Sequence, residues 1–484
     1  MPKPSSRLAR LDMFRSELHA CYPRRADALF ELGDALLGAQ AVPSLPHLSL
    51  EPVHRRGWGS AYAALACGRI DADRLRDLLA SHLPDGDPPV FAVDVTTWPR
   101  CDAECSPERG SYYHPSRHSA GQPIIAGWAF QWIAQVSFDR DSWTAPVDAG
   151  RLHPLDDTDQ TAAGQIRALL ARLPASQAVP LFVFDGGYDS AQLTLDLAEA
   201  PAAVLVGLRS DRCVYADPPP RPAGSTGRPR RHGAKFAFAD PTTWPTPTAT
   251  LIGQDDQYGA VTVQAWGGLH PKQQRHPGHG SRGPRPIVRG TILRVQVERV
   301  PARTRPPKVL WLWWAGPGEL DLDLAWRAYI RRFDLEHTVR FAKQTLGWTA
   351  PRPRHPDQAD RWTWLVLAGY TQLRLAREAA CDQRLPWERP RPQPRLSPYR
   401  VRRGFPRLRA CSARRPPRRN PPDAPQDDPN AAALGRPLAT RPSRSPPTSP
   451  GRSRPRPPDR PRHPPSPPTS VHGQTQHARV KSQA

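Results

Sequence analysis

Two short apolar segments, each carrying one aspartate, constrain the fold of this chain most. Residues 89–98 (PVFAVDVTTW) are rich in Val and Phe, and Asp94 interrupts the apolar run. Residues 179–185 (VPLFVFD) end in Asp185, which two glycines follow. Apolar runs of this length, bounded by turn residues, are typical of buried strands. A buried carboxylate is costly unless it binds a metal or accepts hydrogen bonds, so the two aspartates predict a functional site at the ends of strands. The alternative is that each aspartate caps the turn that follows it.

The neighbouring segments alternate between strand and helix patterns. Further strands are predicted at residues 128–138 and 202–208, and helices at residues 158–173 and 190–199. Strands that alternate with amphipathic helices indicate an α/β domain. Two later helices are predicted at residues 321–345 and 357–380, the second with a Trp and Leu face.

Composition and periodicity divide the chain into five parts. They are an N-terminal helical domain at 1–88, the first part of the α/β domain at 89–209, a β-rich and loop-rich insertion at 210–290, the second part of the α/β domain at 291–384, and a Pro/Arg-rich tail at 385–484. Helical spacing of apolar residues supports the first part, and two consecutive prolines end it.

The C-terminal tail has an unusual composition. Residues 391–484 hold 23 of the 62 prolines and 21 of the 68 Lys and Arg residues, but only 4 of the 45 acidic residues. A segment of this kind cannot bury a core, so we expect it to be disordered. It also carries most of the net charge of +23, so net charge alone does not show that the folded part binds nucleic acid. One hypothesis is that the tail is translated in a shifted reading frame.

Cysteine usage and hydropathy indicate a cytoplasmic protein. The seven cysteines are an odd number without regular spacing, which argues against a disulfide framework. The N-terminus has no apolar stretch of the signal-peptide type, and no segment approaches the roughly 20 apolar residues that span a bilayer. We therefore expect a soluble, intracellular protein without a membrane partner.

A third carboxylate lies in the most specific pattern of the sequence. Tyr329, Arg332, Glu336 and Lys343 have the spacing Tyr-x2-Arg-x3-Glu-x6-Lys. On a helix these offsets place all four side chains on one face, where a carboxylate is flanked by two cations and a phenol. Such a face is suited to holding a metal beside a phosphate backbone. The alternative is an amphipathic helix with solvated charges.

This spacing resembles the third motif of the DDE transposases of insertion sequences. Asp94 followed by Val-Thr-Thr-Trp is similar to the first motif of that family, and Asp185-Gly-Gly-Tyr is similar to the second. The order Asp, Asp, Glu and a β-rich insertion before the Glu also agree. The resemblance covers about residues 10–385 and leaves out the tail.

The resemblance implies an RNase H-like catalytic core, with Asp94 on the first strand, Asp185 on the fourth and Glu336 on a late helix. The three carboxylates would hold two Mg²⁺ or Mn²⁺ ions, which prefer oxygen ligands. Tyr329, Arg332 and Lys343 would contact phosphates near the cut. The partners would be double-stranded DNA, both element ends and target, and further copies of the chain in a homo-oligomer.

The insertion holds further candidates for DNA contact. Arg228, Arg230 and Arg231 lie in the stretch GRPRRHG, which is similar to a minor-groove element; a solvated basic loop is the alternative. Trp266 is a candidate for stacking on an unpaired base, and ordinary packing in a strand is the alternative.

Two other candidate metal sites remain open at this stage. Cys101, Cys105, His114 and His118 form a C-x3-C-x8-H-x3-H pattern like that of a zinc site, with a short central gap. Asp189 is an alternative ligand to Asp185, which we favour because it ends the apolar strand.

Three functions are compatible with these features. The first is an insertion-sequence transposase that hydrolyses phosphodiesters and transfers strands at element ends. The second is an inactive, DNA-binding remnant of such an enzyme. The third is a basic scaffold whose DNA binding does not need residues 89–350.

Overall fold

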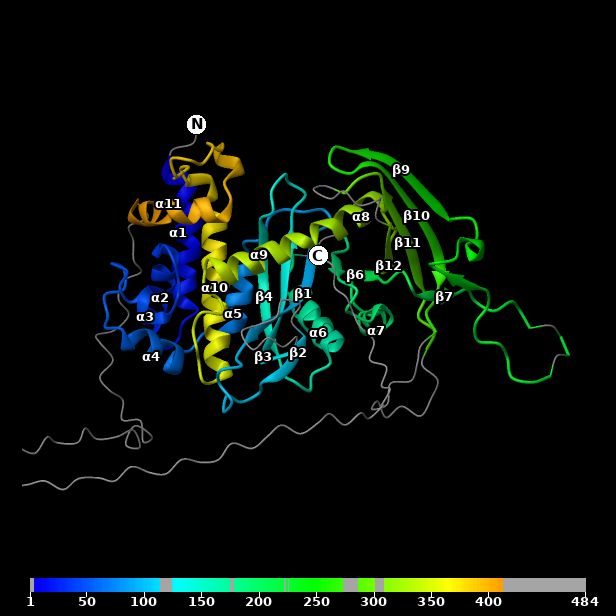
Figure 1. Ribbon diagram of the computed structural model, residues 1–484, viewed down its shortest axis with the longest axis horizontal. Helices are drawn as coiled ribbons and strands as arrows, with labels where there is room; N and C mark the ends of the chain where they lie inside the picture. The colour runs from blue at the N-terminus through cyan, green and yellow to red at the C-terminus, as the bar shows by residue number, and fades with distance from the viewer. Residues whose placement is uncertain are drawn as a thin grey trace, which may run out of the picture. The chain divides into compact units, whose positions relative to one another are not determined.

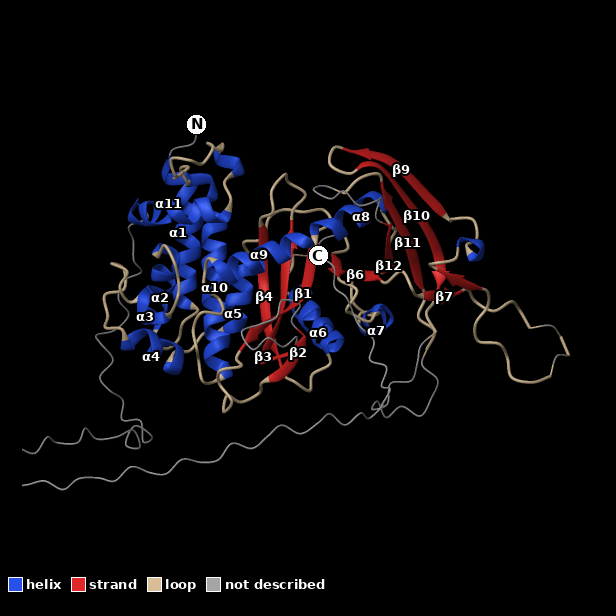
Figure 2. Ribbon diagram, in the orientation of Figure 1, coloured by secondary structure: helices blue, strands red, loops and turns tan. Residues whose placement is uncertain are grey.

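The structure, a computed structural model, describes residues 4–113, 124–174, 178–221, 223–224, 226–272, 286–300 and 309–411. The chain divides into two units: Met1–Pro416 contains every described residue, and Pro417–Ala484 contains none. The first unit combines a group of helices with a large mixed sheet (Figure 1 and Figure 2). In the described ranges, no helix has both the length and the apolar content needed to cross a membrane.

Ten strands form the large sheet. Their spatial order is β2-β3-β1-β5-β6-β12-β11-β10-β9, and β4 pairs with β3 beside β2. The strands are β1 (Val90–Pro99), β2 (Gly110–Tyr113), β3 (Ile124–Val136), β4 (Thr144–Leu152), β5 (Leu181–Phe184), β6 (Ala203–Leu208), β9 (Ala249–Asp255), β10 (Gly259–Leu269), β11 (Gly290–Val297) and β12 (Val309–Ala315).

The half of the sheet that carries the two aspartates has three antiparallel strands followed by two parallel ones. β1 is antiparallel to β3 and β3 to β4, whereas β5 runs parallel to β1 and β6 parallel to β5. β5 consists only of buried apolar residues, as expected for a parallel strand covered on both faces. The sheet therefore provides the mixed α/β framework that the sequence predicts.

Helices cover both faces of this half. Phe91 and Val93 share a core with α6 (Thr158–Leu170) and α7 (Ser190–Asp196). Val90 and Ala92, which point to the opposite face, share the other core with α9 (Phe333–Gln344) and α10 (Pro356–Ala376). Because side chains alternate along a strand, Asp94 belongs to the face that α9 covers.

One strand of this half, β4 (TAPVDAGRL), is missing from the prediction, because Pro146, Asp148 and Gly150 obscure any alternation. Tertiary packing still buries the first six residues of β4. The carboxylate of Asp148 accepts hydrogen bonds from Arg76 Nε and Gln165 Nε2, both 2.9 Å long, which explains how it is tolerated there.

The predicted insertion is mostly a continuation of the large sheet. β9, β10, β11 and β12 form an antiparallel meander, and β12 pairs with β6. The predicted boundary at residue 290 falls within this meander, at the first residue of β11. In the described part of the chain, only β7 (Cys213–Tyr215) and β8 (Lys235–Ala237) form a separate small sheet.

The N-terminal helices share one core with helices from the end of the chain. Ten consecutive residues of α2 are buried, so that helix needs neighbours on every side. Arg15 on α1 donates to Asp34 Oδ1 on α2 at 2.8 Å and to Gln372 Oε1 on α10 at 2.5 Å. Residues 1–88 are therefore not separate from the rest of the fold. These helices are α1 (Pro4–Ala20), α2 (Ala26–Gly38), α3 (Leu45–Leu48), α4 (Gly59–Cys67) and α5 (Ala72–Ala80).

The folded part extends beyond the predicted start of the tail at residue 385. The helix α11 (Pro398–Cys411) contacts α2 and α10, and it buries Val401 and Phe405 in the core. Arg400 pairs with Asp382 at 2.8 Å and Arg403 with Glu388 at 2.7 Å, so part of the arginine excess neutralises nearby carboxylates. Residues 412–484 lie outside the described residues.

The helix predicted at residues 321–345 is two helices. α8 (Leu322–Arg331) ends where α9 begins, with Arg332 between them. Asp321 caps α8 by accepting hydrogen bonds from the backbone N–H groups of Asp323 and Leu324. Three short 3₁₀ turns complete the described fold: η1 (Pro241–Thr243), η2 (Arg377–Ala379) and η3 (Gln393–Arg395).

Candidate active site

The two aspartates lie on neighbouring parallel strands at the same level of the sheet. Val93 on β1 pairs with Phe184 on β5, so Asp94 and Asp185 follow a paired position on each strand. Asp94 Oδ1 accepts a hydrogen bond from the N–H of Val95 at 2.9 Å, and Asp185 Oδ1 accepts one from the N–H of Gly187 at 3.0 Å. The parallel register thus brings together two carboxylates that are remote in sequence.

Three residues of the helical motif, Tyr329, Arg332 and Glu336, lie at or next to the junction of α8 and α9, and Lys343 lies in the last turn of α9. Arg332 Nη1 lies 3.2 Å from Glu336 Oε1, and the Arg332 guanidinium lies 5.7 Å from the centre of the Tyr329 ring. Lys343 Nζ donates a 2.6 Å hydrogen bond to Thr96 Oγ1 on β1. Thr96 lies two residues beyond Asp94, on the same face of the strand.

A glycine on β6 makes room for the motif tyrosine. A Cβ atom on Gly207 would lie 2.3 Å from the Tyr329 hydroxyl oxygen. This close approach places the phenol against the sheet next to β5 and accounts for the glycine in an otherwise apolar strand. Neither Gly207 nor Thr96 was predicted as a site residue, because neither contact shows in the sequence.

Asp94 titrates well above its ordinary range. The pKa of Asp94 is raised to about 7: burial contributes most and the charges of Asp185 and Glu336 add to it, while Arg332 and the hydrogen bond from Val95 act against the rise. The three predicted carboxylates are therefore close enough to interact electrostatically.

The charges of the carboxylates also act on the pKa values of the two motif cations, Lys343 and Arg332. Burial lowers the pKa of Lys343 to about 8, against the effect of the Asp94 charge. Burial also acts to lower the pKa of Arg332, but Asp94, Tyr329, Glu336 and Asp185 together raise it. Arg332 Nε is buried without a hydrogen-bond partner among the described residues. Arg332 is thus a fixed cation inside the carboxylate cluster.

The side chains do not form a closed metal-ligand set. Over the described ranges, no group of three His, Cys, Asp or Glu side chains is arranged to hold a metal ion. Glu336 is paired with Arg332, and its side chain is 41% exposed. The structure therefore brings the three carboxylates near one another without gathering their oxygens around one point.

The alternative ligand Asp189 has a structural role. It caps α7, accepting hydrogen bonds from the N–H groups of Ala191 and Gln192 at 3.0 and 3.2 Å. Tyr188 beside it is buried and accepts a 2.8 Å hydrogen bond from Gln131 Nε2. Asp185 is thus the better candidate of the two, as its carboxylate interacts with Asp94.

The predicted residues of the insertion lie apart from this cluster. Arg228 and Arg230 are exposed and Arg231 is half-buried, in the loop between β7 and β8 that extends beyond the sheet in Figure 1. Trp266 on β10 is 2% exposed, contacts the rings of Phe236 and Trp311, and donates from Nε1 to the carbonyl of Pro245 at 2.8 Å. A stacking role for Trp266 does not fit this burial, whereas the packing alternative does.

The possible zinc pattern is only partly visible. Cys101 is half-buried and its Sγ lies 3.6 Å from the carbonyl of Ala126, while Cys105 is exposed. His114 and His118 lie outside the described residues, so the four side chains cannot be compared.

Comparisons with known proteins identify the family. The family model described as "DDE superfamily endonuclease" matches residues 17–272, just over half of the chain. The match contains Asp94 and Asp185 but ends before Glu336. No curated protein matches this chain.

One solved structure similar to this chain is a cryo-EM structure of the piggyBac transposase synaptic complex with hairpin DNA. It is 11% identical, with a TM-score of 0.39, and the similarity covers 78% of this chain and 70% of that one. At this low TM-score the assignment rests on the family match. The chain belongs to the DDE superfamily endonucleases.

Proposed function

We propose that this chain is the transposase of an insertion sequence, which cuts DNA at the element ends and joins them to a target. The observation that carries the proposal is the electrostatic cluster of Asp94, Asp185 and Glu336 around the buried Arg332. Surface carboxylates of a structural helix would be solvated and would not raise one another's pKa.

The strand order supports an RNase H-like core as the framework. Three antiparallel strands (β4, β3, β1) are followed by β5 and β6, which run parallel to β1. Asp94 lies in the first of these strands, and Asp185 directly follows the fourth when the short β2 is left out. These are the positions expected from the resemblance.

The donor set suits two Mg²⁺ or Mn²⁺ ions. Three carboxylates supply hard oxygen ligands, and burial together with the charges of Asp185 and Glu336 raises the pKa of Asp94, so a bound cation would favour its ionised form. Bound ions would activate a water or a 3′-hydroxyl and stabilise the leaving oxygen. Glu336 would exchange its contact with Arg332 for one with an ion.

The chain's own cations would position the substrate. Arg332 and Lys343 flank the carboxylates, and the phenol of Tyr329 lies beside Arg332. Their charges and hydroxyl suit the phosphates on either side of the bond to be cut, which fixes the register without reading sequence. Arg228, Arg230 and Arg231 would add contacts to the DNA backbone or minor groove, and assembly on two element ends would need a homo-oligomer.

An inactive DNA-binding remnant is the second candidate. It is favoured by one observation, the lack of a closed ligand set among the described side chains. A remnant would bind DNA without cutting it, whereas a transposase would cut when metal is added.

The test is a nicking assay on double-stranded DNA that contains the sequences flanking the gene, with Mg²⁺ or Mn²⁺. We expect metal-dependent nicks, and a loss of at least about 100-fold in Asp185→Asn and Glu336→Gln. Asp211→Asn is the matched control, because Asp211 is 69% exposed and pairs only with Arg209 at 3.3 Å in the described structure. Binding without metal-dependent nicks by the wild type would support the remnant instead. Unchanged DNA binding after deletion of residues 89–350 would favour the scaffold.

A further inference from the structure

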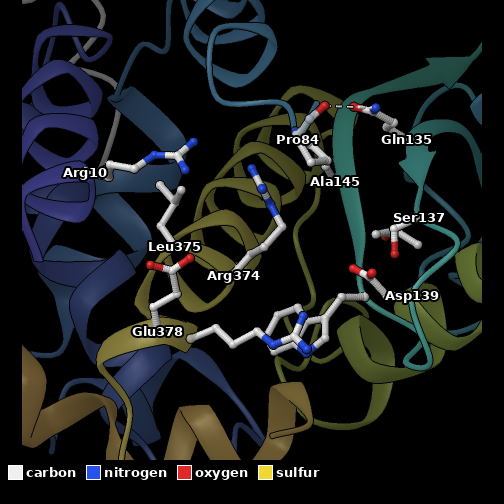
Figure 3. A pocket seen from close by; sticks show the side chains of 12 residues that line it. Arg10, Pro84, Gln135, Ser137, Asp139, Ala145, Arg374, Leu375 and Glu378 are labelled. Carbon is white, nitrogen blue, oxygen red and sulfur yellow. Dashed lines mark hydrogen bonds between the residues drawn. The ribbon is translucent and has the colours of Figure 1, made fainter. Parts of the chain in front are cut away.

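A cavity of about 210 Å³ lies where the helices meet the ends of β3 and β4. Arg10 on α1 and Arg374 on α10 reach it from the helical side, and Gln135, Ser137 and Thr144 line it from the strand side (Figure 3). None of the residues that line it belongs to the carboxylate cluster or to the helical motif. The cavity is therefore a separate feature of the fold.

Arg374 is a cation without a counter-ion in this cavity. Its Nη2 donates to the carbonyl of His82, whereas its Nε is buried and has no hydrogen-bond partner among the residues that the structure describes. In the described part of the chain, no carboxylate forms an ion pair with Arg374. Arg374 is half-buried, and a partly desolvated guanidinium without a negative partner favours a ligand with negative oxygens.

The charges around Arg374 also favour a negatively charged ligand. Arg10, also free of ion pairs within the described ranges, lies close enough to repel it: burial and the Arg10 charge lower the pKa of Arg374 to about 10. Arg377, on the same wall, is already paired with Asp141. The remaining carboxylates of the lining, Asp139 and Glu378, are both exposed.

We propose that this cavity binds a phosphate group between Arg10 and Arg374. Guanidinium groups bind tetrahedral oxyanions through charge-assisted and often bidentate hydrogen bonds. The exposed Asp139 and Glu378 at the rim repel a continuous polyanion more than a compact one. The ligand is therefore a free phosphate or the terminal phosphate of a DNA strand, and the site does not depend on the proposed function.

The cavity wall is bonded to the helices of the candidate active site. Thr144 Oγ1 lies 2.8 Å from Thr338 Oγ1 on α9, two residues beyond Glu336. The carbonyl of Ser137 accepts a 2.7 Å hydrogen bond from Arg331 Nε, at the end of α8. A bound phosphate would therefore stiffen the same loop that holds the junction of α8 and α9.

Thermal unfolding and calorimetry of the full chain, with inorganic phosphate as the probe, test the proposal. We expect phosphate at about ten times its Kd to raise the unfolding midpoint by about 1–2 °C relative to chloride at equal ionic strength. Arg10→Ala should weaken phosphate binding by about tenfold, and Arg374→Gln should abolish it. Arg69→Ala removes an exposed arginine outside the cavity and should change nothing.

The outcomes separate the two sources of phosphate. Competition by a 5′-phosphorylated oligonucleotide, but not by its unphosphorylated form, would identify a strand end as the ligand. Binding of inorganic phosphate without such competition would identify the free anion. Equal midpoint shifts in the wild type and Arg10→Ala would overturn the proposal, and this comparison remains valid if Arg374→Gln fails to fold.

Discussion

Replacing Asp94 with asparagine should stabilise the metal-free protein while removing its activity. The pKa of Asp94 is raised from 3.8 to about 7, so the protonated carboxyl stabilises the fold fully below pH 3.8. That contribution is lost as the pH rises through 7, because the ionised form is buried beside Asp185 and Glu336. The side-chain amide of the Asp94→Asn variant is neutral at every pH, so the variant escapes this loss.

The magnitude follows from the two pKa values. Between pH 5 and pH 8, wild-type stability should fall by about 2.5 kcal/mol relative to Asp94→Asn, since each pKa unit corresponds to about 1.4 kcal/mol. Urea denaturation in EDTA at both pH values measures this difference. The control Asp211→Asn should track the wild type, because its carboxylate is exposed.

Adding Mg²⁺ tests the same electrostatic argument in a second way. At pH 8, added Mg²⁺ should stabilise the wild type and leave Asp94→Asn unchanged, because the ion relieves the same repulsion that the substitution removes. A gap between the two proteins that stays constant from pH 5 to pH 8 would refute the electrostatic reasoning. It would mean that Asp94 is solvated and does not interact with the other two carboxylates.

Three further predictions follow from individual contacts. Gly207→Ala should displace the Tyr329 ring, because the new Cβ would lie 2.3 Å from the hydroxyl oxygen. The free energy of unfolding, measured by urea denaturation, should fall by about 1–3 kcal/mol. Gly253→Ala is the control, because a Cβ there meets no atom within 4 Å among the described residues. Lys343→Met should stabilise the metal-free protein by about 2–3 kcal/mol at pH 7 but by less than about 1 kcal/mol at pH 10. The pKa of Lys343 is lowered from 10.5 to about 8, so stability that the wild type has above pH 10.5 is lost as the pH falls through 8. An equal gain in the free energy of unfolding at both pH values would contradict this. Phe405→Ala should cost about 3–5 kcal/mol because α11 is part of the core, whereas truncation after residue 411 should leave the unfolding midpoint unchanged.

The sequence predicts the central strands well because their signals are local, and it makes the candidate site motifs recognisable for the same reason. The buried runs around Asp94 and Asp185 are continuous and apolar, and the helical motif has a fixed spacing. The strand β4 was missed because its burial depends on helices that cover it from elsewhere in the chain. The break at Arg332 was missed for a similar reason: the spacing of the motif is the same whether the helix is continuous or interrupted.

In the tail, the sequence predicts disorder where the structure has a folded segment. Its composition suggested disorder from residue 385, yet Leu396, Val401 and Phe405 are fully buried. Composition averages over the whole tail, so a short apolar pattern among many prolines and arginines escapes notice.

Arg332 links the metal-free and the metal-bound forms of the proposed enzyme. In the structure it supplies the positive charge among three carboxylates and pairs with Glu336. Bound divalent ions would take over the neutralising role, so that the Arg332 guanidinium would be free to contact a phosphate and Glu336 would be free to bind a metal. One substitution should therefore affect both forms by different routes: Arg332→Met would weaken the metal-free fold and would also lower the affinity for DNA in the presence of metal. A merely structural arginine would produce the first effect without the second.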